Sequence, residues 1–281
     1  IQVATNTGCT ATGVVLVTPV ANDNCSVASV INDAPAAFPL GNTVVTWTVT
    51  DGAGNTATCT QIVEVLDETL PTAKCKDISV NLNAAGTASI TAADINNNST
   101  DNCGIASLVA SKTTFNCSNI GANTVTLTVT DSSGNVSSCT ATVTIFDVTP
   151  PVALCKPFTL NLNASGNATL LATNIDNGSS DNCSFTRTIS MSSFNCSNLG
   201  DNTVTLTITD GSGNSSNCNA TVTVVDTIVP VAQCKNVTLD LNAAGNATYP
   251  ARSSCRALSL RSVYHLSCKE WLSVYVCAGQ T

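Results

Sequence analysis

The sequence has few aromatic and few charged residues. Aromatic residues make up 4% of the 281-residue chain and charged residues 10%. A chain of this length can hold two or three domains of ordinary size. A composition dominated by Thr, Asn, Ser, Val and Ala suits thin β-rich modules with small cores better than one large enzyme domain.

Histidine is almost absent, because only His265 occurs and it lies near the C-terminal end. The rest of the chain therefore cannot form a Ser/His or Cys/His nucleophile pair. The Asp-x-x-Gly-Asn segments lie between two expected strands and open no helix, so they do not match a phosphate-binding loop. We expect no catalytic residues, no bound organic cofactor and no enzyme activity.

Long apolar runs and basic clusters are also missing. No apolar segment approaches the ~20 residues of a membrane helix, and the N-terminus lacks a charged segment followed by an apolar core. The net charge is −8 and no basic stripe offsets it. We expect no nucleic-acid partner and no membrane insertion within this sequence, and we expect any signal peptide or anchor to lie outside it.

Cysteine, by contrast, is abundant, with 15 residues in the chain. No C-x-x-C pair and no Cys/His cluster with zinc spacing occurs, which favours disulfides over zinc sites. Disulfides persist in oxidising compartments. The sequence therefore predicts an extracellular protein, either secreted or anchored at the cell surface.

The sequence repeats with a period of 78 to 80 residues, marked by an Asp-Asn-Cys triplet that ends at Cys25, Cys103 and Cys183. A period this long suits independently folding modules better than a solenoid. Asp-x-x-x-Pro linkers divide the chain into residues 1–67, 71–147 and 151–226, here called repeats 1, 2 and 3, and the start of a fourth module at 230–248. Short proline linkers predict an extended rod with limited bending.

The strand signals in repeat 2 have a period of two. Val125, Leu127 and Val129 alternate with threonines, as expected of a half-buried strand. A second alternating segment follows the Asp-x-x-Gly-Asn turn, which predicts a β-hairpin. About six or seven short strands in ~80 residues predict an all-β fold made of tandem immunoglobulin-like β-sandwich modules.

The segment FPLGNTVVTWTVTDGAGNTATCTQIVEVLDETLP, from Phe38 to Pro71, resembles the hyalin repeat (HYR) family of extracellular immunoglobulin-like modules. Repeats 2 and 3 are similar to divergent copies found in tandem in bacterial surface proteins, and have FNCSN where repeat 1 has FPLGN. The resemblance covers about residues 1–248. It implies adhesion and cell-surface display in broad terms, with no particular ligand.

Residues 249–281 depart from the repeat pattern. They contain four of the ten Lys and Arg residues, the only His and three Cys. The abrupt change favours a frameshift or a cloning or assembly artefact, while a genuine terminal segment is the alternative.

The repeats constrain the disulfide pairing, although four cysteines per repeat leave three pairings open. If Cys9 and the Phe-Asn-Cys cysteine are alternative partners of the Asp-Asn-Cys cysteine, the pairs are Cys9–Cys25, Cys103–Cys117 and Cys183–Cys196. The remaining pairs are then Cys75–Cys139 and Cys155–Cys218, because the first and last strands of such a sandwich can run parallel and side by side. Cys59 is left without a partner.

Calcium is the candidate ligand at the joints between repeats. Hard oxygen ligands from a linker and two loops are what an interdomain Ca²⁺ site requires. The expected ligands are Asp67, Asp101, Asp131 and Asn135 at the first joint, and Asp147, Asp181, Asp210 and Asn214 at the next. Turn chemistry is a sufficient alternative explanation, since Asp and Asn start turns and Gly134 supplies a positive φ.

Together these features predict a non-catalytic structural and adhesive stalk that spaces and presents domains, with multivalent adhesion along the rod. One alternative is a module that binds a surface glycan or a protein receptor, and another is an accessory region of a secreted enzyme. Trp47 stands in an inward-facing position and is expected in the core. Self-association into fibres also remains open.

Overall fold

The computed structural model describes residues 1–234 and 269–270. The chain forms two compact units, Ile1–Thr149 with repeats 1 and 2 and Pro150–Thr281 with repeat 3. The described parts are all-β, with immunoglobulin-like sandwiches, as the sequence predicts. The extended rod stays a prediction, and most of the start of the fourth module and of the atypical tail lies outside the described residues.

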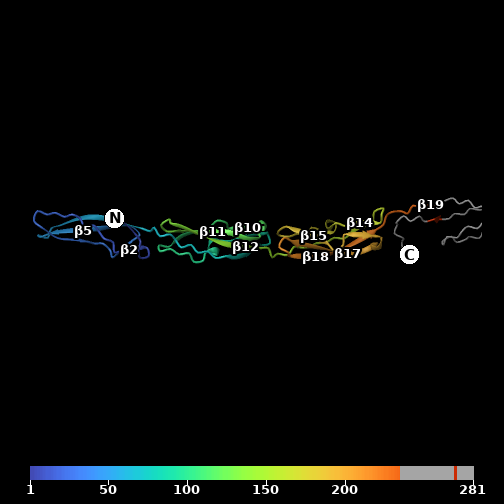
Figure 1. The fold of residues 1–281 in the computed structure, drawn as a ribbon, viewed down its shortest axis with the longest axis horizontal. Coiled ribbons are helices and arrows are strands. Elements are labelled where there is room, and N and C mark those ends of the chain that lie inside the picture. The colour runs from blue at the N-terminus through green and yellow to red at the C-terminus, as the bar shows by residue number, and fades with distance from the viewer. Residues whose placement is uncertain (235–268, 271–281) are drawn as a thin grey trace, which may run out of the picture. The chain divides into compact units, whose positions relative to one another are not determined.

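Repeat 1 consists of a four-stranded sheet and a two-stranded sheet (blue in Figure 1). Its strands are β1 (Gln2–Ala4), β2 (Thr10–Thr12), β3 (Val27–Asn32), β4 (Ala37–Pro39), β5 (Gly41–Asp51) and β6 (Thr56–Leu66). The larger sheet has the order β1-β6-β5-β3, and β2 pairs with β4. The first and last strands, β1 and β6, run parallel.

Repeat 2 has the same strand topology with two additions, a one-turn α-helix and a 3₁₀ turn. Its elements are β7 (Ile78–Asn81), β8 (Thr87–Ser89), α1 (Ala92–Ile95), β9 (Ile105–Ala110), β10 (Thr114–Asn116), the 3₁₀ turn Cys117–Asn119, β11 (Gly121–Asp131) and β12 (Val136–Phe146). The sheets have the orders β7-β12-β11-β9 and β10-β8. The sequence did not predict the one-turn helix α1, because only four residues are helical, just before a polar Asn/Ser segment.

Repeat 3 follows repeat 2 element by element. Its elements are β13 (Phe158–Asn161), β14 (Asn167–Thr169), α2 (Ala172–Ile175), β15 (Phe185–Ile189), β16 (Ser193–Asn195), the 3₁₀ turn Cys196–Asn198, β17 (Gly200–Asp210) and β18 (Ser215–Val225). The strand orders are β13-β18-β17-β15 and β14-β16. A short antiparallel pair, β19 (Gln233–Cys234) with β20 (Lys269–Glu270), completes the described strands.

The core lies between the two sheets of each repeat. The alternating residues Val125, Leu127 and Val129 of β11 are fully buried, which matches the period-two pattern. Burial of one such side chain contributes about 1.5–3 kcal/mol. Trp47, the counterpart of Leu127 in repeat 1, is only 5% exposed, so it is a core residue as predicted.

Each long hairpin ends in the Asp-x-x-Gly-Asn turn. In repeat 2 the turn joins β11 to β12, and Gly134 has a φ of 95°, which disfavours side chains with a Cβ. The backbone N–H of Asp131 donates to the carbonyl of Asn135. The turn therefore places Asp131 and Asn135 at the end of the sandwich where the linker enters.

Candidate metal site between repeats 1 and 2

Three carboxylates from separate elements meet where repeat 1 joins repeat 2. Asp67 follows β6, Asp101 belongs to the Asp-Asn-Cys loop, and Asp131 ends β11. One oxygen from each lies within 4.8 Å of the others. Asp67 is 7% exposed and Asp131 is 1% exposed, while Asp101 is half-buried. The linker and the two loops therefore meet as the sequence predicts.

Asp131 is held by its own turn. Its Oδ1 accepts hydrogen bonds from the backbone N–H groups of Ser133 (2.9 Å) and Asn135 (2.8 Å), and its Oδ2 accepts one from Asn135 Nδ2 (2.8 Å). Burial raises the pKa of Asp131, but the hydrogen bonds, chiefly from Asn135, outweigh it and hold the pKa below the ordinary value. The carboxylate is therefore ionised at neutral pH.

Asn135 ties this turn to the linker. Its Nδ2 also donates to the carbonyls of Asp67 (2.9 Å) and Thr69 (3.3 Å). In this orientation the amide nitrogen acts as a donor at the joint, whereas a calcium ligand would have to present its amide oxygen. A ligand role for Asn135 stays a prediction.

Asp67 is the most widely connected of the three acids. Its Oδ1 accepts from Thr5 Oγ1 (3.3 Å), the backbone N–H of Thr69 (3.1 Å) and Asn102 Nδ2 (3.1 Å). Its Oδ2 accepts from Ser133 Oγ at 3.4 Å. Contacts from repeat 1, the linker and repeat 2 therefore converge on one carboxylate.

Asp101 has one buried oxygen with no hydrogen-bond partner. Its Oδ2 accepts from the backbone N–H of Cys103 at 2.7 Å, but its Oδ1 has none. A buried carboxylate oxygen without a partner is costly unless a cation or water satisfies it. The oxygen-only donor set, close together and negatively charged, fits a hard divalent cation such as Ca²⁺.

The second predicted group has two parts that belong to different units. In unit 2, Asp210 accepts from the N–H groups of Ser212 and Asn214 (both 2.8 Å), and Asn214 Nδ2 bonds Asp210 Oδ2 (2.8 Å). Asp181 Oδ2 accepts from the N–H of Cys183 at 2.8 Å. Asp147 belongs to unit 1, so the assembly of this group stays a prediction.

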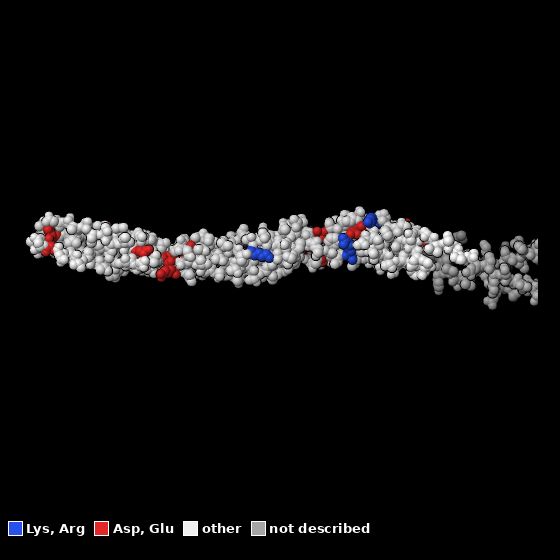
Figure 2. Space-filling view, turned by 90° about the horizontal axis from the view of Figure 1, so that it is seen from above, with Lys and Arg blue, Asp and Glu red and all other residues white. Residues whose placement is uncertain are grey.

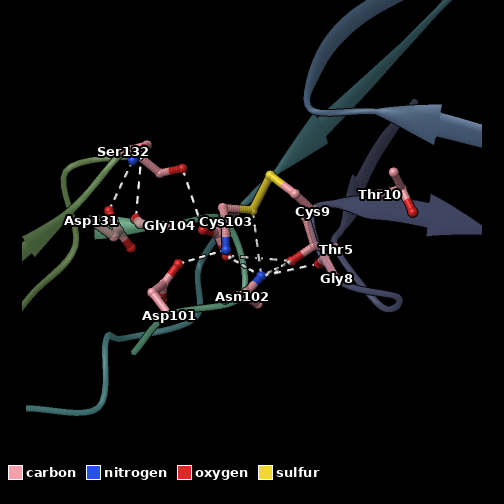
Figure 3. The surroundings of a disulfide bond; sticks show 12 residues. Thr5, Gly8, Cys9, Thr10, Asp101, Asn102, Cys103, Gly104, Asp131 and Ser132 are labelled. Atoms are coloured by element: carbon pink, nitrogen blue, oxygen red, sulfur yellow. Dashed lines mark hydrogen bonds between the residues drawn. A yellow bond between two sulfur atoms is a disulfide. The ribbon is translucent and has the colours of Figure 1, made fainter. Parts of the chain in front are cut away.

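A disulfide crosses the joint beside the acidic cluster. Cys9, in the turn between β1 and β2, is bonded to Cys103, and Figure 3 shows this bond next to Asp101 and Asn102. Asn102 Nδ2 donates to Thr5 Oγ1 and to the carbonyl of Gly8, both at 3.2 Å. Asn102 belongs to the loop that the sequence places at this joint, and its side chain contacts repeat 1 directly.

This bond corrects two predicted pairs, Cys9–Cys25 and Cys103–Cys117. Thr5 N–H bonds the carbonyl of Leu66, while Gly52 N–H bonds that of Ser26, so Cys9 and Cys25 lie at opposite ends of the β5–β6 hairpin. Eleven residues of strand span about 33 Å, whereas a disulfide needs Cα atoms within about 7 Å. The sequence suggested local pairs because it does not show at which end of the sandwich a loop emerges.

The other predicted pairs have different outcomes. Cys75–Cys139 and Cys155–Cys218 are disulfides in the structure, as predicted. Cys117, Cys183 and Cys196 are disulfide-bonded too. The predicted Cys183–Cys196 pair is inconsistent with the structure. Phe185, close to Cys183, pairs with Asp210, whereas the Cys196 sulfur lies at Gly166, by the opposite end of the sheet.

Surface charge is sparse on the face drawn in Figure 2. Lys and Arg side chains are few and scattered there, and most of this face is neither acidic nor basic. Within the described residues, no helix is long and apolar enough to cross a membrane.

Comparison with known proteins gives one family match. The HYR domain model matches residues 1–65 and again residues 66–145. No curated protein matches the chain. The second matched range contains Asp67, Asp101 and Asp131, and the bond across the joint links Cys9 of the first range to Cys103 of the second.

Solved structures give only distant likenesses. The protocadherin gammaB7 EC3-6 cis-dimer is 14% identical with a TM-score of 0.32, over 85% of this chain and 75% of that one. Titin domains I67-I69, as an E-to-A variant, are 11% identical with a TM-score of 0.33, over 66% and 75%. Protocadherin gamma B7 domains 1-4 are 12% identical with a TM-score of 0.28, and this chain spans 62% of their length. At these TM-scores the likeness carries no argument.

Proposed function

Because the chain belongs to the HYR domain family, we propose that it is a non-catalytic structural and adhesive stalk of an extracellular protein, stiffened by Ca²⁺ between repeats 1 and 2. Family membership and the disulfides support an extracellular, adhesion-type repeat region. The stalk spaces and presents other domains, and its repeated modules combine several weak contacts into multivalent adhesion.

The observation that carries the calcium proposal is the convergence of Asp67, Asp101 and Asp131 with one buried carboxylate oxygen lacking a partner. Three carboxylates within 4.8 Å repel one another, and a divalent cation offsets that repulsion. Because the three side chains come from the linker and two loops of repeat 2, an ion bound to all of them restrains bending at the joint. A Ca²⁺ ion needs further oxygens from backbone, side chains or water to reach about six to eight ligands.

Thermal unfolding of the full chain in EDTA and in Ca²⁺ tests this proposal. Binding at about ten times the Kd adds about 1.4 kcal/mol to the stability of the folded state. We expect a higher Tm in Ca²⁺ and a smaller rise in Asp67→Asn. Asp94→Asn, which removes a carboxylate outside the cluster, should keep the full rise. An equal Tm in EDTA and in millimolar Ca²⁺ would exclude the ion.

A second candidate function, binding of a protein receptor, has one specific observation in its favour. Val15, Val17 and Val20 of repeat 1 are 86%, 68% and 91% exposed, in a segment between β2 and β3 that forms no strand. Exposed apolar side chains gathered in one segment are typical of interaction sites. If Val15→Ser, Val17→Ser and Val20→Ser together leave cell-surface adhesion unchanged, this candidate fails.

A further inference from the structure

Two cysteines of repeat 1 carry free thiols although their counterparts in repeats 2 and 3 are bonded. Cys25 and Cys59 are free and exposed. Their counterparts in repeat 2, Cys103 and Cys139, form disulfides. In both cases the partner cysteine, Cys9 or Cys75, lies in the part of the chain that precedes β7, the first strand of repeat 2.

Cys25 lies in a loop built like that of Cys103. The backbone N–H of Cys25 donates to Asp23 Oδ2 at 2.8 Å, and that of Cys103 donates to Asp101 Oδ2 at 2.7 Å. In repeat 2 this loop receives Cys9 from the turn of the preceding repeat. The loop of repeat 1 therefore presents its sulfur for the same kind of partner.

Cys59 occupies the position of Cys139 on the last strand of its repeat. Cys59 pairs with Trp47 across β5 and β6, as Cys139 pairs with Leu127 across β11 and β12. Cys139 is bonded to Cys75, just before β7, which runs parallel to β12. Because β1 runs parallel to β6 in the same way, a partner for Cys59 would lie just before β1.

The hairpin turn at Asp51 in repeat 1 has the same internal hydrogen bonds as the turn at Asp131 in repeat 2. Asp51 accepts from the N–H groups of Ala53 and Asn55 (both 2.8 Å) and from Asn55 Nδ2 (2.7 Å). In repeat 2 the equivalent Asn135 also bonds the carbonyls of the incoming linker, whereas Asn55 is exposed. This end of repeat 1 thus has the groups with which repeat 2 holds repeat 1.

We propose that this end of repeat 1, defined by Asp23, Cys25, Asp51, Asn55 and Cys59, docks a further HYR module through two disulfides. The docked module supplies a turn cysteine like Cys9 to Cys25, and the chain that joins this module to Ile1 supplies a cysteine like Cys75 to Cys59. The joint repeats the bond already present between repeats 1 and 2. It does not depend on calcium and therefore goes beyond the proposed function.

Each new bond requires a two-electron oxidant, for which a small disulfide such as oxidised glutathione suffices. The Cys25 thiolate attacks one glutathione sulfur, forms a mixed disulfide and releases one glutathione thiolate. The thiolate of the docked module then attacks the Cys25 sulfur and releases the second glutathione. Both thiol protons end on the two glutathione thiolates, and Cys59 reacts in the same way.

A chain extended by a copy of residues 1–77 placed directly before Ile1 tests the proposal. The copy's Asp77 then joins Ile1 as Asp77 joins Ile78, which keeps the register of the repeat. The copy carries Cys25→Ser and Cys59→Ser, so that signals from these thiols come from the original repeat. The chain is refolded with reduced and oxidised glutathione, alkylated, and mapped by mass spectrometry without reduction.

We expect both thiols to be protected, with Cys25 bonded to the copy's Cys9 and Cys59 to the copy's Cys75. A Cys9→Ser change in the copy should free Cys25 alone. The Cys75–Cys139 and Cys155–Cys218 bonds in the same map report correct folding. Alkylated Cys25 in a chain with those bonds intact, or a Cys25–Cys59 bond, would overturn the proposal.

A second measurement tests the proposal without relying on correct folding of the extended chain. The original chain is incubated with a peptide of residues 5–12, TNTGCTAT, in the same glutathione buffer. We expect the peptide to bond Cys25 more than Cys59, and more than a scrambled peptide does. Equal labelling of both thiols by both peptides would contradict the proposal.

Discussion

Cys9 and Cys103 are 94 residues apart in sequence, yet a disulfide joins them across the joint between repeats 1 and 2. The bond fixes the β1–β2 turn of one repeat to the Asp-Asn-Cys loop of the next. That loop also carries Asp101, and the turn lies beside Thr5, which bonds Asp67. The covalent bond and the hydrogen bonds of Asp67 therefore hold the same two surfaces together.

Removal of this bond should loosen the joint and leave both sandwiches folded. In the chain-entropy model, closing a loop of about 100 residues is worth up to about 4.7 kcal/mol. Cys9→Ser with Cys103→Ser should accelerate limited proteolysis within the linker, residues 67–71. Cys75→Ser with Cys139→Ser is the matched control and should instead lower the unfolding temperature of repeat 2. Unchanged linker cleavage in the first variant would show that the bond does not restrain the joint.

Asn135 should contribute more to stability than Asn55, its counterpart in repeat 1. Both amides bond the aspartate of their own turn, but only Asn135 is observed to bond the linker carbonyls of Asp67 and Thr69. Each net hydrogen bond is worth about 1 kcal/mol. Asn135→Ala should therefore lower the free energy of unfolding by about 1–2 kcal/mol more than Asn55→Ala does, as measured by chemical denaturation. Equal losses in the two variants would contradict this role of the linker bonds.

Leu127 is one of the core positions of repeat 2, where shortening the side chain should cost the most stability. It is fully buried, and Leu127→Ala removes apolar contacts and leaves a cavity. We expect a loss of about 2–5 kcal/mol in the free energy of unfolding. Val109→Ala, at a side chain that is 58% exposed, is the control and should change stability by less than about 0.5 kcal/mol.

The Asp94 carboxylate should make stability depend on pH in the acid range. The backbone N–H and the hydroxyl of Thr91 donate to its Oδ2 at 2.7 and 2.8 Å, and these bonds hold the pKa of Asp94 below its ordinary value of 3.8. Since the folded pKa is lowered, the stabilisation is complete above pH 3.8 and is lost as the pH falls through the folded value.

Urea unfolding of the wild type and of Asp94→Asn, in EDTA between neutral pH and about pH 2, measures this effect. The difference in stability between the two proteins should be constant at neutral pH and shrink at the acid end. A difference that does not change with pH would mean that the Thr91 bonds do not stabilise the charged carboxylate.

The hairpin of each repeat could be predicted from sequence because its signals are local. Alternating Val, Leu and Thr residues specify a strand with one buried face, and Gly134 permits the positive φ of the turn. The parallel neighbours β7 and β12 followed from the expected topology, and with them the Cys75–Cys139 bond. Helix α1 escaped prediction because one turn carries too few residues for a periodic signal.

The sequence by itself determined the repeats, their β-sandwich class and the loops that carry the acidic residues, because these depend on patterns within a few residues of one another. Only the tertiary structure decided that Cys9 bonds Cys103 and not Cys25. The reason is physical: a strand of eleven residues separates the two ends of a sandwich by about 33 Å. Cysteines that are near in sequence can therefore lie far apart, while the end of one repeat meets the beginning of the next.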